Sequence, residues 1–240
     1  MTEQMRFLAH RGQSATHPEN TIPALREAVR VGADGVTIDV QPTADGAIVL
    51  MHDRTPLRTT NLRHVMLSKV GLSVQRFTLA ELATLDAGAW KHPEFAGIPI
   101  PTLRDVVHAL RDSHVRLTVE LRPAAVGPRG YVRAVLEELG GREWVSLISA
   151  DREIARAALP VHPTVGLVTR RPTDDDLDHF DEIHVSPHRI DRELVQRIHA
   201  AGGTAVASTV DDPREVERLR ALGVDAVATH DVVVARPMPV

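Results

Sequence analysis

The residues of this sequence whose types and spacing best suit chemistry lie between Thr37 and Asp53, in the stretch TIDVQPTADGAIVLMHD. Two runs of alternating apolar residues flank Asp45-Gly46, and Asp-Gly between such runs predicts a tight two-residue β-turn. This turn would set Asp39 opposite His52, with both side chains on one face of the hairpin. A histidine titrates near neutral pH, so an Asp–His pair can take part in proton transfer. A surface hairpin with an incidental Asp–His pair would show the same pattern.

Two more groups of polar residues follow the first apolar run of the chain. His10-Arg11-Gly12 comes directly after Phe7-Leu8-Ala9, and Pro18-Glu19-Asn20-Thr21 comes shortly later. If the apolar run is a strand, His10 lies at the carboxyl end of that strand. Which residues His10 meets therefore depends on how the strands of the chain are arranged.

The rest of the chain alternates between short apolar runs and segments whose apolar residues recur at helical spacing. We predict strands over residues 6–9, 35–40, 116–121, 145–150, 164–169, 182–186, 204–209 and 225–229. We predict helices over residues 20–31, 102–112, 130–139, 151–158, 173–180, 191–201 and 213–222. This α/β alternation indicates a parallel sheet, and eight strands indicate closure into a (β/α)8 TIM barrel. An open doubly wound sheet is the alternative, but the sequence lacks the Gly-x-Gly-x-x-Gly turn of nucleotide-binding sheets.

The segment after the second predicted strand departs from this alternation. Residues 47–51 follow that strand too closely for a parallel crossover, so they should form the antiparallel return of a hairpin. Residues 54–101 should form a long inserted loop or cap with one short helix over 79–85, and connections of this length are often functional. We expect residues 1–240 to form a single domain that ends in a mobile tail over residues 232–240.

In a TIM barrel the active site lies at the carboxyl ends of the strands. The polar residues at or near the predicted strand ends are His10, Asp39, Glu120, Ser149, Ser186, Ser208 and Thr229. The hairpin return would bring His52 back to the same rim. The order of the elements therefore predicts that these side chains gather at one end of the barrel.

The composition bounds the class of protein. With 240 residues, 43% of them hydrophobic, the chain can bury a large core. A formal net charge of −4 and an aromatic content of 3% argue against a nucleic-acid partner. The sequence has no cysteine, which is compatible with a reducing compartment. It also shows no signal peptide and no apolar run of about 18 residues, so we expect a cytoplasmic protein without stable membrane insertion.

Nine short segments of the chain resemble, in order, segments of the glycerophosphodiester phosphodiesterase family. They are AHRG at 9–12, PENT at 18–21, GAD at 32–34, IDV at 38–40, TADG at 43–46, MHD at 51–53, RTT at 58–60, VELRP at 119–123 and GVD at 223–225. The resemblance covers nearly the whole chain. It implies a TIM barrel, and an enzyme of lipid metabolism that hydrolyses glycerophosphodiesters to glycerol 3-phosphate and an alcohol.

The resemblance also implies roles for four residues. His10 and His52 match the two histidines that act as general base and general acid in the family. Arg11 matches an arginine that binds the phosphate. Arg122 stands where the family usually has lysine, so it keeps the charge but would engage a phosphate through a planar fork.

The metal site implied by the resemblance is incomplete in this sequence. Asp39 and Glu120 match two ligands of a divalent metal, and oxygen ligands favour Mg²⁺ or Ca²⁺. Thr37 stands where the family has its first metal-binding glutamate, and a neutral hydroxyl is a poor ligand for either ion. We expect Glu19 and Asn20 in supporting positions, where they would cap the first helix and brace the His10 loop.

Three further positions depart from the resembled pattern. Ser208 and Asp211 replace the tryptophan and asparagine of a Trp-Thr-Val-Asn motif, and His230 follows Thr229 where aspartate is usual. These changes should make the floor of the pocket more polar.

Three functions are compatible with these residues. The chain is an active glycerophosphodiesterase with a weaker or rearranged metal site, or it acts on another phosphodiester or phosphate ester. The third possibility is a degenerate member that binds a phosphate ligand or a protein partner without turnover. The retention of both histidines, Arg11, Asp39 and Glu120 favours chemistry on a small-molecule phosphodiester. The sequence sets neither the alcohol of the substrate nor the oligomeric state.

Overall fold

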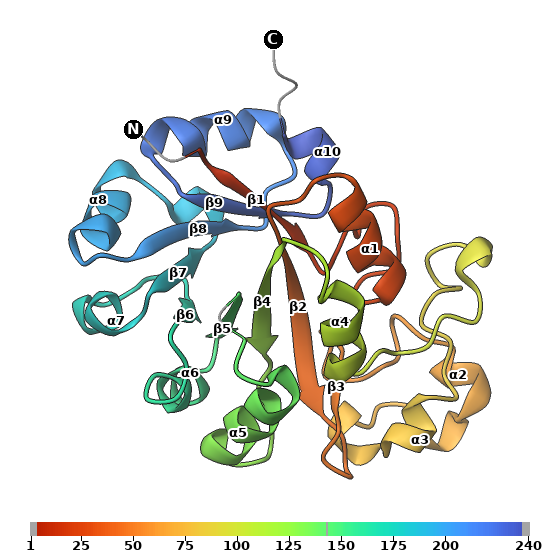
Figure 1. The fold of residues 1–240 in the computed structure, drawn as a ribbon. Helices are drawn as coiled ribbons and strands as arrows, with labels where there is room; N and C mark the ends of the chain where they lie inside the picture. The colour runs from red at the N-terminus through yellow and green to blue at the C-terminus, as the bar shows by residue number, and fades with distance from the viewer. Residues whose placement is uncertain (1–3, 143, 237–240) are drawn as a thin grey trace.

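Eight parallel strands close into a barrel in the computed structural model, which describes residues 4–142 and 144–236 (Figure 1). The closure is made by β1, which pairs with β9 on one side and with β2 on the other. The barrel strands are β1 (Arg6–His10), β2 (Gly35–Pro42), β4 (Arg116–Leu121), β5 (Val145–Ser149), β6 (Val165–Val168), β7 (Glu182–Val185), β8 (Thr204–Ser208) and β9 (Ala226–Thr229). The predicted (β/α)8 TIM barrel is confirmed.

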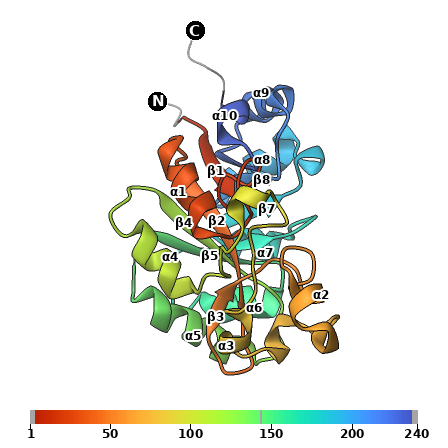
Figure 2. The ribbon, with the colours of Figure 1, turned by 90° about the vertical axis from the view of Figure 1, so that its right-hand side faces the viewer.

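Helices follow the strands and surround the barrel, as the turned view shows (Figure 2). They are α1 (Ile22–Arg30), α4 (Leu103–Leu110), α5 (Pro128–Leu139), α6 (Arg152–Ala158), α7 (Asp174–His179), α8 (Arg192–Ala200), α9 (Pro213–Leu222) and α10 (Val232–Ala235). Their buried apolar side chains pack with those of the strands in one large hydrophobic cluster. Each predicted barrel helix is present, with bounds that differ by a few residues.

The second strand carries the hairpin that the sequence predicts, but its register is different. β3 (Ile48–Leu50) runs antiparallel to β2, with Val40 opposite Leu50 and Met51 N donating to Asp39 O. Asp39 is therefore opposite Met51, and the predicted Asp39–His52 pairing is wrong by one residue. The tight two-residue turn predicted for Asp45-Gly46 would need a positive φ at both residues. Only Gly46 has a positive φ in this turn, so the loop is of another type.

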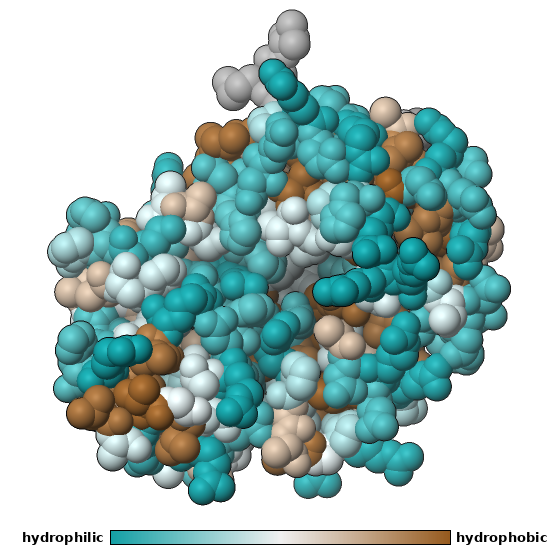
Figure 3. Space-filling view, turned by 180° about the vertical axis from the view of Figure 1, so that it is seen from behind, coloured by the Kyte–Doolittle hydropathy of each residue, from teal (hydrophilic) through white to brown (hydrophobic). Residues whose placement is uncertain are grey.

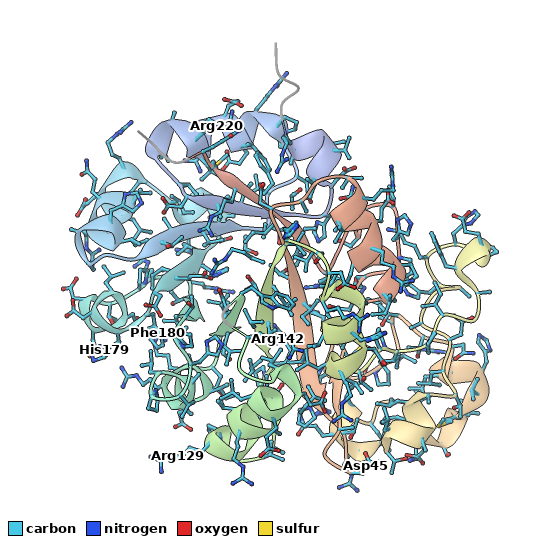
Figure 4. All side chains as sticks on the ribbon, viewed as in Figure 1. Asp45, Arg129, Arg142, His179, Phe180 and Arg220 are labelled. Carbon is cyan, nitrogen blue, oxygen red and sulfur yellow. The ribbon has the colours of Figure 1, made fainter. Side chains whose placement is uncertain are left out.

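Contacts with the segment over residues 54–101 hold this longer turn. Thr43 Oγ1 donates to Asp45, whose carboxylate also accepts from Leu79 N. Ala44 N donates to Phe77 O over 2.7 Å. Figure 4 shows Asp45 at the outer end of the hairpin. Because these partners lie more than 30 residues away, the local Asp-Gly signal could not reveal them.

Residues 54–101 form more structure than the single helix predicted for them. They contain α2 (Leu62–Val65), α3 (Leu79–Leu82) and the 3-10 turns η1 (Leu67–Lys69), η2 (Val74–Arg76) and η3 (Pro93–Phe95). We call this segment the insert. It lies beside the barrel, beyond β3 (Figure 1). Seen from behind, a hydrophobic patch marks the edge of the molecule that carries α2, where Val65 and Leu67 are exposed (Figure 3).

The insert has its own small hydrophobic cluster, and β3 is the wall that it shares with the barrel. Ile48 and Leu50 belong to the barrel cluster, whereas Val49 and Met51 belong to the cluster of the insert. Because side chains alternate along a strand, one face of β3 serves each core.

The end of the chain is also more ordered than predicted. Val232–Ala235 forms α10, whose Val232 and Ala235 are fully buried, so the prediction of a mobile tail is wrong for these residues. Asp231 caps this helix by accepting from Val233 N and Val234 N. Residues 237–240 lie outside the described residues. In the part of the chain that is described, none of the helices is long and apolar enough to cross a membrane.

Candidate active site

The carboxyl ends of the strands hold the side chains that the sequence placed there. His10, Ser149, Ser208 and Thr229 are the last residues of their strands, and Ser186 follows β7 directly. Asp39 of β2 lies opposite Glu120 of β4 in the parallel register. The gathering of these side chains at one end of the barrel is therefore confirmed.

The loop after β1 is shaped by two residues in the left-handed region. Arg11 has φ 61°, and Gly12 has φ 81°. A Cβ on Gly12 would lie 2.6 Å from the backbone of Ala24 in α1, so glycine is required by conformation and by space. Arg11 N donates to Thr37 O over 2.8 Å, which fixes the loop against β2. Such strain is common where a functional side chain must be aimed.

Asp39 is held by Asn20 and Arg11. Asn20 Nδ2 donates to Asp39 Oδ2 over 2.9 Å, and Asp39 N donates to Asn20 Oδ1 over 3.1 Å. Arg11 Nε lies 2.9 Å from the same Oδ2. Asp39 Oδ1 is buried and has no hydrogen-bond partner among the described residues.

The expected capping role of Glu19 and Asn20 is wrong. Thr21 holds the N-cap position of α1 and makes no side-chain cap bond. Asn20 instead braces Asp39, and its backbone N–H donates to Arg11 O, so the predicted bracing of the His10 loop is present. Glu19 accepts from Arg11 Nη1 over 2.9 Å.

Glu120 lies between a cation and a second carboxylate. Arg122 Nη1 donates to Glu120 Oε1. Burial and the nearby charge of Asp39 raise the pKa of Glu120, while Arg122 works in the opposite direction. The Nε of Arg122 is buried and makes no hydrogen bond within the described residues, whereas the Nε of Arg11 lies 2.9 Å from Asp39 Oδ2. One guanidinium N–H group is thus left for an anion beside the carboxylate pair.

His52 is oriented by its neighbour in sequence and by the insert. Its Nδ1 lies 2.7 Å from Asp53 Oδ1, and Arg58 Nε donates to Asp53 Oδ2 over 2.6 Å. The Arg58 hydrogen bonds lower the pKa of Asp53 to about 2, with a further contribution from His52. Asp53 is therefore ionised at neutral pH and accepts the Nδ1 proton of His52, which leaves Nε2 for a substrate. Arg58 also donates to both oxygens of Glu19, so one network joins the insert to the loop after β1.

His10 is oriented by residues that the sequence prediction did not assign. His10 Nδ1 lies 3.2 Å from His230 Nε2, and His230 Nδ1 lies 2.7 Å from Asp211 Oδ2. Burial lowers the pKa of His10 well below its ordinary value, and the charges of Arg11, His230 and His52 lower it further. His10 is therefore neutral at physiological pH, the state that a general base needs.

The carboxylates of the site fit one hard cation, with fewer ligands than the resemblance implies. Asp39 and Glu120 are adjacent, and Asp39 offers a buried oxygen without a partner. Thr37 Oγ1 accepts from Arg11 N at 3.3 Å and adds no negative charge. The described residues contain no cluster of three or more His, Cys, Asp or Glu side chains suited to a metal ion. Asp39 and Glu120 are therefore the two carboxylates that a cation would meet at this rim.

A small pocket lies where the barrel meets the insert. Its lining comes from the loop after β1, the hairpin return and the insert, with Glu19, Asn20, His52, Thr59 and Ile100 among its residues. The pocket is next to the His52–Asp53–Arg58 network, so the insert forms one wall of the site.

Four residues of the site were missed by sequence reasoning. Asp53 and Arg58 lie within the segments MHD and RTT, so their place in the motifs was the available signal. Asp211 and His230 were noted only as departures from the resembled pattern. Their meeting depends on the adjacency of β8 and β9, which carries them to the same rim.

Comparison with known families gives one match over most of the chain. Residues 10–138 and 148–234 match the model of the glycerophosphoryl diester phosphodiesterase family. A glycerophosphodiester phosphodiesterase from Caldanaerobacter subterraneus is 32% identical over 235 residues, which cover 93% of each chain. A probable glycerophosphodiester phosphodiesterase 1 from Mycobacterium tuberculosis is also 32% identical, over 93% of this chain and 88% of its own.

Solved structures with the same fold include two phosphodiesterases. An Oleispira antarctica phosphodiesterase in complex with the product sn-glycerol 3-phosphate superposes with a TM-score of 0.84 at 30% identity. The match covers 94% of this chain and 92% of that one. A glycerophosphodiester phosphodiesterase from Agrobacterium tumefaciens gives a TM-score of 0.80 at 24% identity, over 97% and 99% of the two chains, which supports the fold alone.

Proposed function

Because the chain belongs to the glycerophosphoryl diester phosphodiesterase family, we propose that it hydrolyses glycerophosphodiesters to sn-glycerol 3-phosphate and an alcohol. The observation that carries this proposal is a set of unpaired polar groups at one rim of the barrel. Arg122 Nε and Asp39 Oδ1 are buried without hydrogen-bond partners in the described residues, beside the Arg11–Asp39 ion pair. A phosphodiester with a cation would satisfy both.

His10 is the general base of this reaction. Its lowered pKa keeps it neutral, so it takes a proton from the attacking water as the new P–O bond forms. His52 is the general acid. It donates a proton to the leaving oxygen as the P–O bond to the alcohol breaks. Asp53 stabilises the imidazolium form of His52 from the Nδ1 side.

The negative charge of the phosphate is balanced by Arg11, by Arg122 and by a divalent cation. Arg11 is pre-aimed by its left-handed backbone and by its contacts with Asp39 and Glu19. Asp39 and Glu120 would hold Mg²⁺ or Ca²⁺, which would supply Lewis-acid stabilisation of the phosphoryl oxygens. With two carboxylates in place of three, we expect the affinity for the cation to be weak.

Turnover of a substrate panel tests this function. Metal-stripped protein is assayed with glycerophosphocholine, -ethanolamine, -inositol and -glycerol, with Mg²⁺, Ca²⁺ or chelator added back. We expect metal-dependent release of glycerol 3-phosphate from at least one of them. His10→Ala and His52→Ala should each lower kcat on the order of 10²- to 10⁴-fold, the usual contribution of a general acid or base.

The matched control is His179→Ala, because His179 lies on the outer helix α7 away from the site (Figure 4). This variant should turn over at the wild-type rate. If folded protein hydrolyses none of the four diesters with either metal, the chain is a binding protein or uses another ester. The panel also identifies the alcohol. A cytoplasmic location and the absence of a nucleic-acid partner stay predictions.

A further inference from the structure

A chain of hydrogen bonds leads from the His10 ring away from the phosphate site. His230 Nε2 lies 3.2 Å from His10 Nδ1, and the two rings meet edge to face, with centroids 5.1 Å apart. The other ring nitrogen of His230 lies 2.7 Å from Asp211 Oδ2. Asp211 is itself fixed, because its Oδ1 accepts from His230 N over 2.8 Å and from Thr229 Oγ1 over 3.0 Å.

The positions of the protons along these hydrogen bonds are set by Asp211, the residue farthest from the phosphate site. Burial acts to raise the pKa of Asp211, but the hydrogen bonds from His230 outweigh it and the pKa is lowered. Asp211 is therefore an ionised acceptor, and His230 Nδ1 must carry the proton between them. In neutral His230, Nε2 is then unprotonated and can only accept. His10 Nδ1 must donate to it, so the remaining ring nitrogen of His10, Nε2, has a free lone pair.

We propose that Asp211 and His230 set the tautomer of His10, so that His10 presents an unprotonated Nε2 to the attacking water. Both are positioning residues, since they act through His10 and not on the substrate. The kinetic consequence rests on the proposed phosphodiesterase function. The tautomer itself does not, and can be measured in protein that turns nothing over.

The same chain predicts how acid inactivates the enzyme. Asp211 and His10 face His230, while Arg11, His52 and Glu19 face His10. A proton that binds His230 Nε2 would lie on the line between the two rings, with Asp211 on the other side of the His230 ring. His230 Nε2–H then donates to His10 Nδ1, and the His10 proton moves to Nε2. One added proton therefore blocks His10 Nε2, the basic atom. The loss of activity in acid then has an apparent pKa that belongs to the pair of rings and not to either one.

Nitrogen-15 NMR of the histidine rings tests the tautomer directly. We expect the wild-type protein to show His10 protonated at Nδ1 and bare at Nε2. In Asp211→Asn, the amide can donate to His230 Nδ1, so His230 should carry its proton on Nε2. His10 should then switch to the Nε2–H form. A His10 tautomer that is Nε2–H in the wild type, or unchanged in Asp211→Asn, overturns the proposal.

Kinetics give an independent test if the enzyme turns over. Asp211→Asn should lower kcat on the order of 10²-fold or more with little change in KM, by analogy with other histidines deprived of their orienting carboxylate. His230→Gln keeps an acceptor for His10 Nδ1 and should retain more activity than His230→Leu. Glutamine takes up no proton, so only the His10 ring can then be protonated. Burial and the charge of Arg11 lower the pKa of His10 and so oppose its protonation. The acid limb of kcat/KM should therefore move to lower pH in His230→Gln.

A matched pair elsewhere controls for simple loss of an Asp–His contact. His199 Nε2 lies 2.9 Å from Asp225 Oδ2, at the opposite end of β9 from the site. Asp225→Asn should leave kcat and the acid limb unchanged. In the double variant Asp211→Asn/His230→Gln, kcat should match that of His230→Gln alone, since no tautomer remains to be set. Additive losses, or an unmoved acid limb in His230→Gln, would mean that the contact is only structural.

Discussion

At the scale of single residues, the site balances its carboxylates with arginines. Arg11 lies against Asp39 and Glu19, while Arg122 lies against Glu120. Thr37 is buried beside them and contributes a neutral oxygen. The two expected cation ligands, Asp39 and Glu120, each lie against a guanidinium group, so charge should limit the affinity of the metal site.

Thr37→Glu should strengthen metal binding. A third carboxylate beside Asp39 and Glu120 raises both the number of oxygen ligands and the negative charge, which are the main determinants of Ca²⁺ affinity. We expect Kd for Ca²⁺ and Mg²⁺ to fall by about tenfold or more, measured by isothermal titration calorimetry. Thr37→Gln is the control, because it adds similar volume without charge. Equal affinity of the Glu and Gln variants would refute the account of this site as a carboxylate-poor one.

At the scale of elements, one ion pair between a buried carboxylate and a half-exposed arginine fixes α7 to α6 on the barrel wall. Asp176 is completely buried and closes the capping box of α7 with Thr173. Arg152 of α6 donates to both of its oxygens, over 3.1 and 2.9 Å. These Arg152 hydrogen bonds lower the pKa of Asp176 to about 2, from an ordinary value of 3.8.

Asp176→Asn should reduce the free energy of unfolding at pH 7 by about 2 kcal/mol, the linkage equivalent of this pKa shift. Because the folded pKa is the lower one, this stabilisation is complete above the unfolded value and is lost as pH falls through about 2. The difference between wild type and variant should therefore shrink between pH 4 and pH 2 in urea titrations. Asp175→Asn, at an exposed ion pair, should change stability by less than about 1 kcal/mol. A difference that does not vary with pH would contradict this assignment.

The elements also show what the sequence could and could not predict. The strands and helices of the barrel followed from periodicity, because each buries one face against the same core. The register of the hairpin did not, since Leu79 N and Phe77 O in the insert hold its turn. Likewise, α2 is only four residues long and is stabilised by the burial of Leu62 in the cluster of the insert, which local spacing does not reveal.

The same distinction applies to the site. His10 and Arg11 were predictable because they stand at the end of β1 and directly after it, and Asp39 because it lies in a recognisable motif of β2. The orientation of His10 was not, since His230 and Asp211 come from the last two strands, about 200 residues along the chain. A partner at that distance in sequence is visible only once the barrel has closed.

At the scale of the whole molecule, β3 separates two hydrophobic cores. Its alternate side chains enter the barrel cluster and the cluster of the insert. Polar contacts tie the insert to the barrel as well, through Arg58 to Glu19 and through Lys91 Nζ to Ser14 O. The single domain expected from the sequence therefore contains two packing units, and the smaller one carries a wall of the site.

Two buried valines can show whether these units open separately. Val49 packs in the cluster of the insert and Val119 in the barrel cluster, and both are fully buried. Replacing either valine with alanine should lower the free energy of unfolding by on the order of 2 kcal/mol, because it leaves a cavity. By hydrogen exchange, Val49→Ala should speed exchange in α2 and α3 while the barrel strands stay protected, because local opening follows local packing. Val119→Ala should speed exchange in the strands. KM should rise only in Val49→Ala, since Arg58 and Thr59 belong to the insert. Equal acceleration everywhere in both variants would show one cooperative core, with β3 as its interior and not its boundary.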